Sequence, residues 1–445
     1  MTIPFLQSMI VLLTGIVLIV VLTTKYKIHA FFALIAACLL VGLGLELSLA
    51  DILATTKTGF GNIIGALGLI IVFGTTLGII LEHTGATVVL ANAILKLTGQ
   101  QRAASAMNIT GYVVGLPIFC DSGYIVLSSL NNNIAARTGT TMALMAASLA
   151  SGLYAVHCLI PPHPGAAAAT ATLSADFGLV VLYGMLVAIP TAFCGFLWAK
   201  YATINMPVTI SPKQDDVVME QITQQQLPSV GISILPIAIP ILLIGIRSFI
   251  TVNESSSFLL KSLYAIGAPE VALGIGILLA IFGKRNWKRE DFNALLRQAV
   301  EKAGDILLII GAGGAFGALI AQVNMAEYLS GNDVVSSLGL FFPFIVASLL
   351  KTAQGSSSVA IITTATMVLP MLSSLGLDHT MGKVCAVLAM GAGSMMVSHA
   401  NDSYFWVISR FSGIGMSVML RVYTVATLVM GIVAIGLIYL LYLVL

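Results

Sequence analysis

Residues 156–165 read VHCLIPPHPG, and this stretch decides how the chain folds. Its three prolines remove backbone donors and interrupt an apolar helix that we predict over residues 141–175. A second stretch, SHANDSYFW at 398–406, interrupts the apolar segment 383–408 in the corresponding place. Irregular backbone inside a membrane-spanning segment is tolerated only where protein or a water-filled cavity surrounds it. Each stretch therefore predicts a broken helix at the centre of a membrane protein.

The composition supports a membrane location. The chain has 445 residues, of which 58% are hydrophobic and 9% charged, and its mean hydropathy is +1.03. A soluble protein carries about 25% charged residues because water must solvate its surface. The first apolar stretch, residues 5–24, lacks the basic region and cleavage site of a signal peptide and predicts a permanent helix. We therefore expect a multi-pass membrane protein.

Other classes of partner have little support in the sequence. The net charge of +2 gives no indication of nucleic-acid binding. The five cysteines lie in apolar segments and have neither paired nor metal-type spacing, so we expect no disulfide, metal or cofactor.

The apolar segments predict an all-α polytopic fold in two halves. Residues 1–200 form the first half, residues 201–230 a polar cytoplasmic linker, and residues 231–445 the second half. The predicted helices occupy 5–24, 28–45, 63–81, 141–175 and 177–199, then 231–252, 265–284, 304–323, 383–408 and 421–444. Two further segments, 104–130 and 338–376, are predicted to enter and leave the membrane on the same side.

Three pairs of segments recur in the same order and at nearly constant separation. GTTLG at 74–78 corresponds to GGAFG at 313–317, and His157 corresponds to His399. Between them, the residues around Asp121 correspond to those around Ser356. Such duplications commonly have inverted topology, and the substrate then binds near the midplane. We therefore predict two inverted repeats of five transmembrane helices, each with a re-entrant hairpin and a broken helix.

The hairpin tips are the other candidate positions for chemistry. The first tip reads GLPIFCDSG at 115–123, and the second reads KTAQGSSS at 351–358. Each tip would point free backbone N–H groups and a helix N-terminus at the centre, which favours a carboxylate. The sequence therefore predicts a small anionic substrate such as a sugar acid.

The candidate site residues come from the two tips and the two breaks. Asp121 is either a coupling residue or a cap of the hairpin turn. A histidine in such a site either carries a proton or donates a fixed hydrogen bond. The predicted substrate-binding residues are Ser122, Lys351, Gly355, Ser356, Ser357, Ser358, His157, His399 and Asn401, and the predicted proton-coupling residues are Asp121, Asp402 and His157. We expect His163 and the glycines of 311–317 to be structural.

At these motifs the chain resembles the gluconate:proton symporter family of the ion-transporter superfamily. VHCLIPPHPG, SHANDSYFW, GAGGAFG from Gly311 and QGSSSVA from Gln354 carry the resemblance, which extends over nearly the whole chain. It implies a multi-pass symporter of a bacterial inner membrane, often a homodimer in lipid, whose hairpins and broken helices move as one domain past a scaffold, as in an elevator. Its implied substrates are gluconate-like sugar acids taken up with protons.

Several alternatives stay open at this point. Relatives in the family take D-serine, so a small hydroxy or amino acid is an alternative substrate. Asp402 and Asn401, with freed carbonyls, offer oxygen ligands for sodium, so sodium-coupled carboxylate transport is an alternative to proton coupling. A channel would not concentrate its solute, and an enzyme is disfavoured because no HExxH or GxSxG motif occurs.

The charge pattern predicts the topology. Most of the 20 Lys and Arg residues, Lys302 among them, fall on the cytoplasmic side if both termini are outside, as the positive-inside rule requires. We expect cysteines introduced at 213 and 288 to react with an impermeant thiol reagent only after the membrane is opened. Cysteines at 261 and 445 are expected to react in intact cells, and protection of position 261 would contradict this topology.

Overall fold

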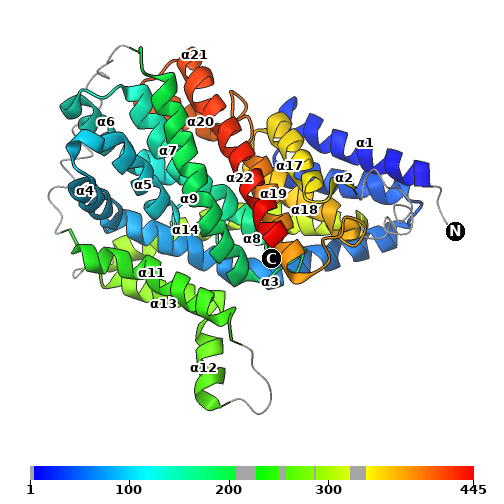
Figure 1. Cartoon of the computed structure of the whole chain (residues 1–445). Coiled ribbons are helices and arrows are strands. Elements are labelled where there is room, and N and C mark those ends of the chain that lie inside the picture. Colours follow the sequence, from blue (N-terminus) through cyan, green and yellow to red (C-terminus); the bar gives the residue numbers. More distant parts are fainter. Residues whose placement is uncertain (1–4, 207–226, 251–256, 285–286, 321–336, 445) are drawn as a thin grey trace.

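The computed structural model describes residues 5–206, 227–250, 257–284, 287–320 and 337–444 (Figure 1). All regular structure in these ranges is helical. The first half contains α1 (Phe5–Thr24), α2 (Ala30–Gly44), α3 (Leu49–His83), α4 (Ala86–Thr98), α5 (Ala103–Gly115), α6 (Cys120–Thr138), α7 (Met142–Leu159), α8 (Pro164–Thr172) and α9 (Phe177–Ala202). Most of the polar linker, residues 207–226, lies outside the described residues.

The second half follows a similar order of helices. It contains α11 (Val230–Arg247), α12 (Phe258–Ile266), α13 (Pro269–Ile281), α14 (Arg289–Ile320), α17 (Phe341–Gln354), α18 (Ser357–Val368), α19 (Thr380–Met395), α20 (Ser403–Ser412), α21 (Met416–Met419) and α22 (Val425–Val444). A π-helical turn, Leu420–Thr424, joins α21 to α22. Figure 1 shows α12 projecting from the body of the molecule.

Six helices in the described ranges are long and apolar enough to cross a membrane. A seventh span results if α12 and α13, which are bent by 70° relative to each other, count as one. Large apolar side chains on several of these helices face outward; Leu186 and Ile189 of α9, for example, are 56% and 55% exposed. Such a surface suits lipid rather than water, so the fold is that of a polytopic membrane protein.

Two of the predicted helices are longer than the sequence indicated. We expected residues 63–81 and 304–323, whereas α3 has 35 residues and α14 has 32. The N-terminal part of α3 begins at a Ser48 cap and carries Lys57, and that of α14 carries Arg297 and Lys302. A window of uninterrupted apolar residues cannot detect such amphipathic extensions, because their charged side chains lie on one face only. The charges on them belong to helices rather than to loops.

The predicted helix breaks lie where the prolines and polar residues placed them. In the first half, α7 ends at Leu159 and α8 starts at Pro164, a residue that suits the first helical position because it needs no N–H there. In the second half, α19 ends at Met395 and α20 starts at Ser403. The two hairpin segments are likewise pairs of helices, α5–α6 and α17–α18, each joined by a short turn.

Glycines allow the long helices to approach the hairpins closely, as the sequence analysis expected for 311–317. A Cβ atom on Gly78 of α3 would lie 2.6 Å from the carbonyl oxygen of Pro117 in the first hairpin turn. On α14, a Cβ atom on Gly313 would lie 2.2 Å from the side chain of Ile362 in α18. The corresponding glycine motifs therefore pack each long helix against the hairpin of its own half.

The contact between α5 and α7 gives a test of this packing. A Cβ atom on Gly152 would lie 2.2 Å from the carbonyl oxygen of Asn108, whereas a Cβ atom on Gly436 would meet nothing within 4 Å. Ala is a better helix former than Gly by about 1 kcal/mol, so Gly436→Ala is expected to keep or raise the melting temperature. Gly152→Ala is expected to lower it, because overpacking against rigid backbone costs about 1–3 kcal/mol. Thermal unfolding in detergent measures both, and equal effects would contradict this packing.

Candidate functional site

The two breaks and the two hairpin tips meet around a group of buried tyrosines. Tyr154 of α7 stacks on Tyr404 of α20 with ring centroids 5.6 Å apart. Tyr124 of α6 meets Tyr404 edge-on at 6.1 Å. Helices α7 and α19 cross closely, since a Cβ atom on Gly391 would lie 2.5 Å from the carbonyl oxygen of Cys158. Residues far apart in the sequence therefore form one centre.

The second hairpin tip turns at Gly355. Its φ of +82° is left-handed, and a Cβ atom there would lie 2.1 Å from the carbonyl oxygen of Asn401. Only glycine satisfies both conditions. The tip of α17–α18 thus lies directly against the second helix break.

A buried ion pair joins this tip to the break. The Nζ atom of Lys351 lies 2.7 Å from Oδ2 of Asp402, and the two side chains are 0% and 6% exposed. Lys351 also donates to the Gly355 carbonyl at 2.5 Å and lies 5.7 Å from the centroid of the Tyr154 ring. Ser398 donates to the same Asp402 oxygen at 2.5 Å. Lys351 and Asp402, both predicted site residues, therefore neutralise each other.

His399 and Asn401 hold the end of α17. The Nδ2 group of Asn401 donates to the Thr352 carbonyl at 2.8 Å, and Nε2 of His399 lies 3.1 Å from the same oxygen. The last carbonyls of a helix have no partner within it, so these side chains replace water there. Both residues were predicted to bind substrate and do lie at the centre, and the contacts described here are with backbone carbonyl groups.

The three serines of the tip face different surroundings. Ser356 caps α18 by accepting from the backbone N–H of Val359 at 3.3 Å. Ser357 is 7% exposed and interacts with Cys158 of the first break. Ser358 is half-buried, and its Cα lies 3.0 Å from the Cβ position of Gly165 in α8. The serines thus lie between the second tip and the first break.

Asp121 lies at the first hairpin tip but does not cap its helix. The N-cap residue of α6 is Phe119, whose side chain makes no capping hydrogen bond, and Asp121 is the second residue of the helix. Oδ1 of Asp121 is buried and has no hydrogen-bond partner among the described residues. Asp121 interacts electrostatically with Asp402, Lys302 and Lys351. The capping interpretation fits Asp402 instead, which accepts from the backbone N–H of Tyr404 at 3.0 Å.

Ser122, next to Asp121, contacts a residue that the sequence analysis did not include in the site. Lys302 of α14 donates to Oγ of Ser122 at 2.5 Å, and its Nζ lies 4.9 Å from the centroid of the Phe119 ring. The sequence analysis assigned Lys302 to the cytoplasmic side because it precedes the predicted helix at 304–323. The length of α14 brings it to the hairpin tip.

The first break places its two histidines side by side. His157 is 8% exposed, stacks on Tyr154 at 6.3 Å, and lies 5.0 Å from the ring of His163. Nε2 of His163 lies within hydrogen-bond distance, 2.8 Å, of the Gly115 carbonyl, which supports its expected structural role. Nδ1 of His157 is buried without a partner among the described residues.

Several of the buried polar atoms that have no partner among the described residues belong to this centre. They include atoms of Asp121, His157, Asn401 and Gln354. A buried polar group without a hydrogen bond costs about 1–3 kcal/mol, so such groups are rare unless they serve a ligand or bound water. The arrangement suits a small polar solute.

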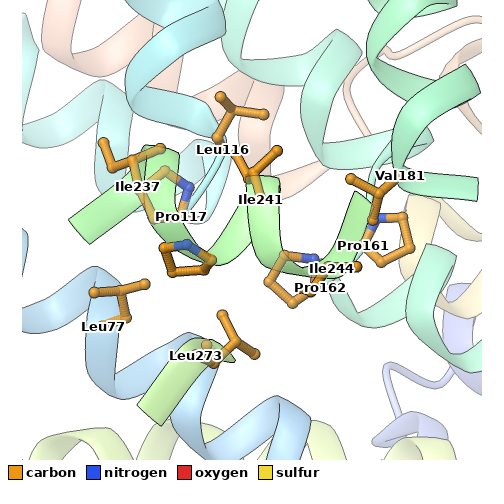
Figure 2. A pocket seen from close by; sticks show the side chains of 12 residues that line it. Leu77, Leu116, Pro117, Pro161, Pro162, Val181, Ile237, Ile241, Ile244 and Leu273 are labelled. Carbon is orange, nitrogen blue, oxygen red and sulfur yellow. The ribbon is translucent and has the colours of Figure 1, made fainter. Parts of the chain in front are cut away.

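An apolar cavity lies beside the first hairpin tip (Figure 2). Leu116, Pro117, Pro161 and Pro162 of the first tip and first break form one wall, and α3 closes it with Gly74 and Leu77. The rest of the lining consists of Val181 of α9, Ile237, Pro240, Ile241 and Ile244 of α11, and Leu273 of α13. None of the described residues that line this cavity is charged, so the contacts of the tip with α11 and α13 there are apolar.

The fold and this centre define a multi-pass membrane transporter, in which polar groups meet inside a lipid-facing helical body. Residues 7–444 match the model of the GntP permease family, so the chain belongs to that family. The protein is accordingly an inner-membrane permease and not an enzyme.

Three relatives with different named substrates have the same sequence identity to this chain. The chain is 31% identical to a gluconate permease of Pseudomonas aeruginosa over 97% of each chain. It is 31% identical to the Gnt-II system L-idonate transporter of Escherichia coli over 94% of this chain and 95% of that one. A D-serine transporter of Escherichia coli is 31% identical over 96% of each chain. In fold, the chain is similar to the YdaH transporter of Alcanivorax borkumensis, with a TM-score of 0.57, 14% identity and 89% of each chain covered.

The buried ion pair gives a stability prediction. Lys351→Met leaves the Asp402 carboxylate buried without its partner, and such a loss costs about 3–5 kcal/mol. We therefore expect a strongly lowered melting temperature in detergent. The double variant Lys351→Met with Asp402→Asn removes both charges and is expected to recover most of the loss. Equal melting temperatures for the single variant and the wild type would contradict the pairing.

Proposed function

We propose that this permease takes up a gluconate-like sugar acid together with protons. The observation that supports this most is the meeting of both hairpin tips and both helix breaks at one buried polar centre. Gluconate and L-idonate are named for two of the relatives at 31% identity. Ser122 of the first tip and Ser358 of the second would bind hydroxyl and carboxylate oxygens of such a substrate, and the unpartnered Oδ1 of Asn401 would accept from a substrate hydroxyl.

D-serine is the alternative substrate. The D-serine transporter has the same 31% identity over 96% of the chain, so overall identity does not distinguish the two. Both molecules carry a carboxylate and a neighbouring polar group. The number of hydroxyl-binding groups at the tips favours the polyhydroxylated acid.

The proposed mechanism is of the elevator type. In it, the two hairpins and the two broken helices move together past a scaffold that includes α11 and α13. The apolar cavity of Figure 2 supports this division, because an apolar interface slides without breaking hydrogen bonds. The similar order of helices in both halves supports inverted repeats, with hairpins entering from opposite sides. Following the family resemblance, we further propose a homodimer in the lipid bilayer.

The charges at the centre support the proposed proton coupling. A proton on Asp402 would end its pairing with Lys351 and so loosen the second tip from the second break. Asp121, whose buried oxygen has no partner among the described residues, is the second candidate carboxylate. His157, beside the first break, is a candidate relay between them. Substrate and proton would then both bind when the second tip is loosened from the second break.

A gradient experiment tests this function. Uptake of an anion against an inside-negative potential is opposed by about 2.3 kcal/mol per charge per 100 mV, so a cation must accompany it. We expect proteoliposomes to accumulate gluconate when a pH gradient alone is imposed. Asp402→Asn is expected to exchange gluconate without concentrating it. If this single variant is unstable, the neutral double variant Lys351→Met with Asp402→Asn is measured in its place. Accumulation driven by sodium after the pH gradient has collapsed would contradict proton coupling.

A further inference from the structure

Two lysines lie where the hairpin tips meet, and they differ in how their charge is neutralised. Lys351 is fully buried and lies 2.7 Å from Asp402. Lys302 is half-buried, and no carboxylate of the described residues lies within 4.0 Å of its ammonium group. Its contacts are the Ser122 hydroxyl and the face of Phe119. Among the described residues, Lys302 is therefore the lysine of the centre that forms no ion pair.

The geometry around Lys302 suits a carboxylate. Because Lys302 donates to the oxygen of Ser122, the hydroxyl proton of Ser122 remains available for an anion. The 19-residue helix α6 begins two residues before Ser122, and the N-terminus of a helix attracts anions. An ammonium, a hydroxyl and a helix N-terminus thus converge at one tip. Glu82 and Asp121 interact with Lys302 electrostatically, but neither forms an ion pair with it.

Lys351 cannot take the same role without a loss. To bind the carboxylate of a substrate, Lys351 would have to leave Asp402, which would then be buried and unpaired. The Gly355 carbonyl would also lose the hydrogen bond that Lys351 donates to it. Breaking a buried pair in this way costs several kcal/mol. Lys302 gains an ionic partner and loses none.

We propose that Lys302 is the cation that binds the substrate carboxylate, together with the hydroxyl of Ser122. This inference rests on the proposed function. It changes the predicted role of Lys351, which then pairs with Asp402 and does not bind the substrate. It also places the bound acid between the first hairpin and α14, so that substrate bridges the hairpin and the long helix of the other half.

Substrate exchange in proteoliposomes without any ion gradient tests the inference. The gluconate KM of Lys302→Gln and of Lys302→Met is expected to rise about 10- to 100-fold, the loss typical of a hydrogen bond to a charged group. Lys302→Arg keeps the charge and is expected to have a lower KM than either. Arg297→Gln is the matched control, because Arg297 lies on the same helix in an exposed pair with Glu301 and its removal is expected to leave KM unchanged.

The outcomes separate the inference from the proposed function. An unchanged KM in both neutral variants would overturn the role of Lys302, as would a lowered maximal rate alone, which indicates that Lys302 only holds the hairpin. If the wild type exchanges D-serine but no sugar acid, the proposed substrate is wrong, and the same variants test Lys302 with D-serine. Failure of the wild type to exchange any carboxylic acid would overturn both. The rise in melting temperature with gluconate in detergent measures binding independently of transport rate and is expected for the wild type and not for Lys302→Gln.

Discussion

The ion pair between Lys351 and Asp402 is the interaction on which the rest of the centre depends. An isolated charge in such a buried place costs several kcal/mol, so each side chain requires the other. Lys351 belongs to the second hairpin and Asp402 to the second helix break, and the pair therefore fixes these two elements against each other. Gly355 makes the close approach possible, because any side chain at this position would clash with the carbonyl of Asn401.

The helix breaks of the two halves satisfy their backbone polar groups in different ways. A break inside a membrane helix leaves carbonyl and N–H groups without partners, and lipid cannot supply them. The first break removes donors by means of Pro161, Pro162 and Pro164, and the nearby Gly115 carbonyl lies within hydrogen-bond distance of His163. The second break has no proline and instead uses side chains: His399 and Asn401 contact the end of α17, and Asp402 caps α20. The first break can thus remain apolar, which explains why it lines the cavity against α11.

The sequence located the breaks and the tips, because proline, glycine and polar residues within apolar segments are strong local signals. It did not predict the Lys351–Asp402 pair, since the two residues are 51 positions apart and their contact depends on how the hairpin folds back. It missed Lys302 for a different reason. Lys302 lies outside the apolar window of its helix, so it was interpreted as one of many cytoplasmic charges. It also assigned a possible cap to Asp121, whereas Asp402 is the residue that caps, because tertiary contacts rather than local spacing decide which carboxylate meets free N–H groups.

The charges of the centre also suggest why substrate and proton would bind together under the proposed function. Asp121 interacts electrostatically with Asp402, Lys302 and Lys351. The two carboxylates and two ammonium groups of this set have no net charge. A monovalent acid adds one negative charge to this poorly solvated set, and a proton on either carboxylate removes it again. Each ligand therefore lowers the electrostatic cost of binding the other, and such coupling is reciprocal. Because the two carboxylates lie on different structural elements, one at the first tip and one at the second break, the proton that balances the substrate charge also changes the contacts that hold those elements in place.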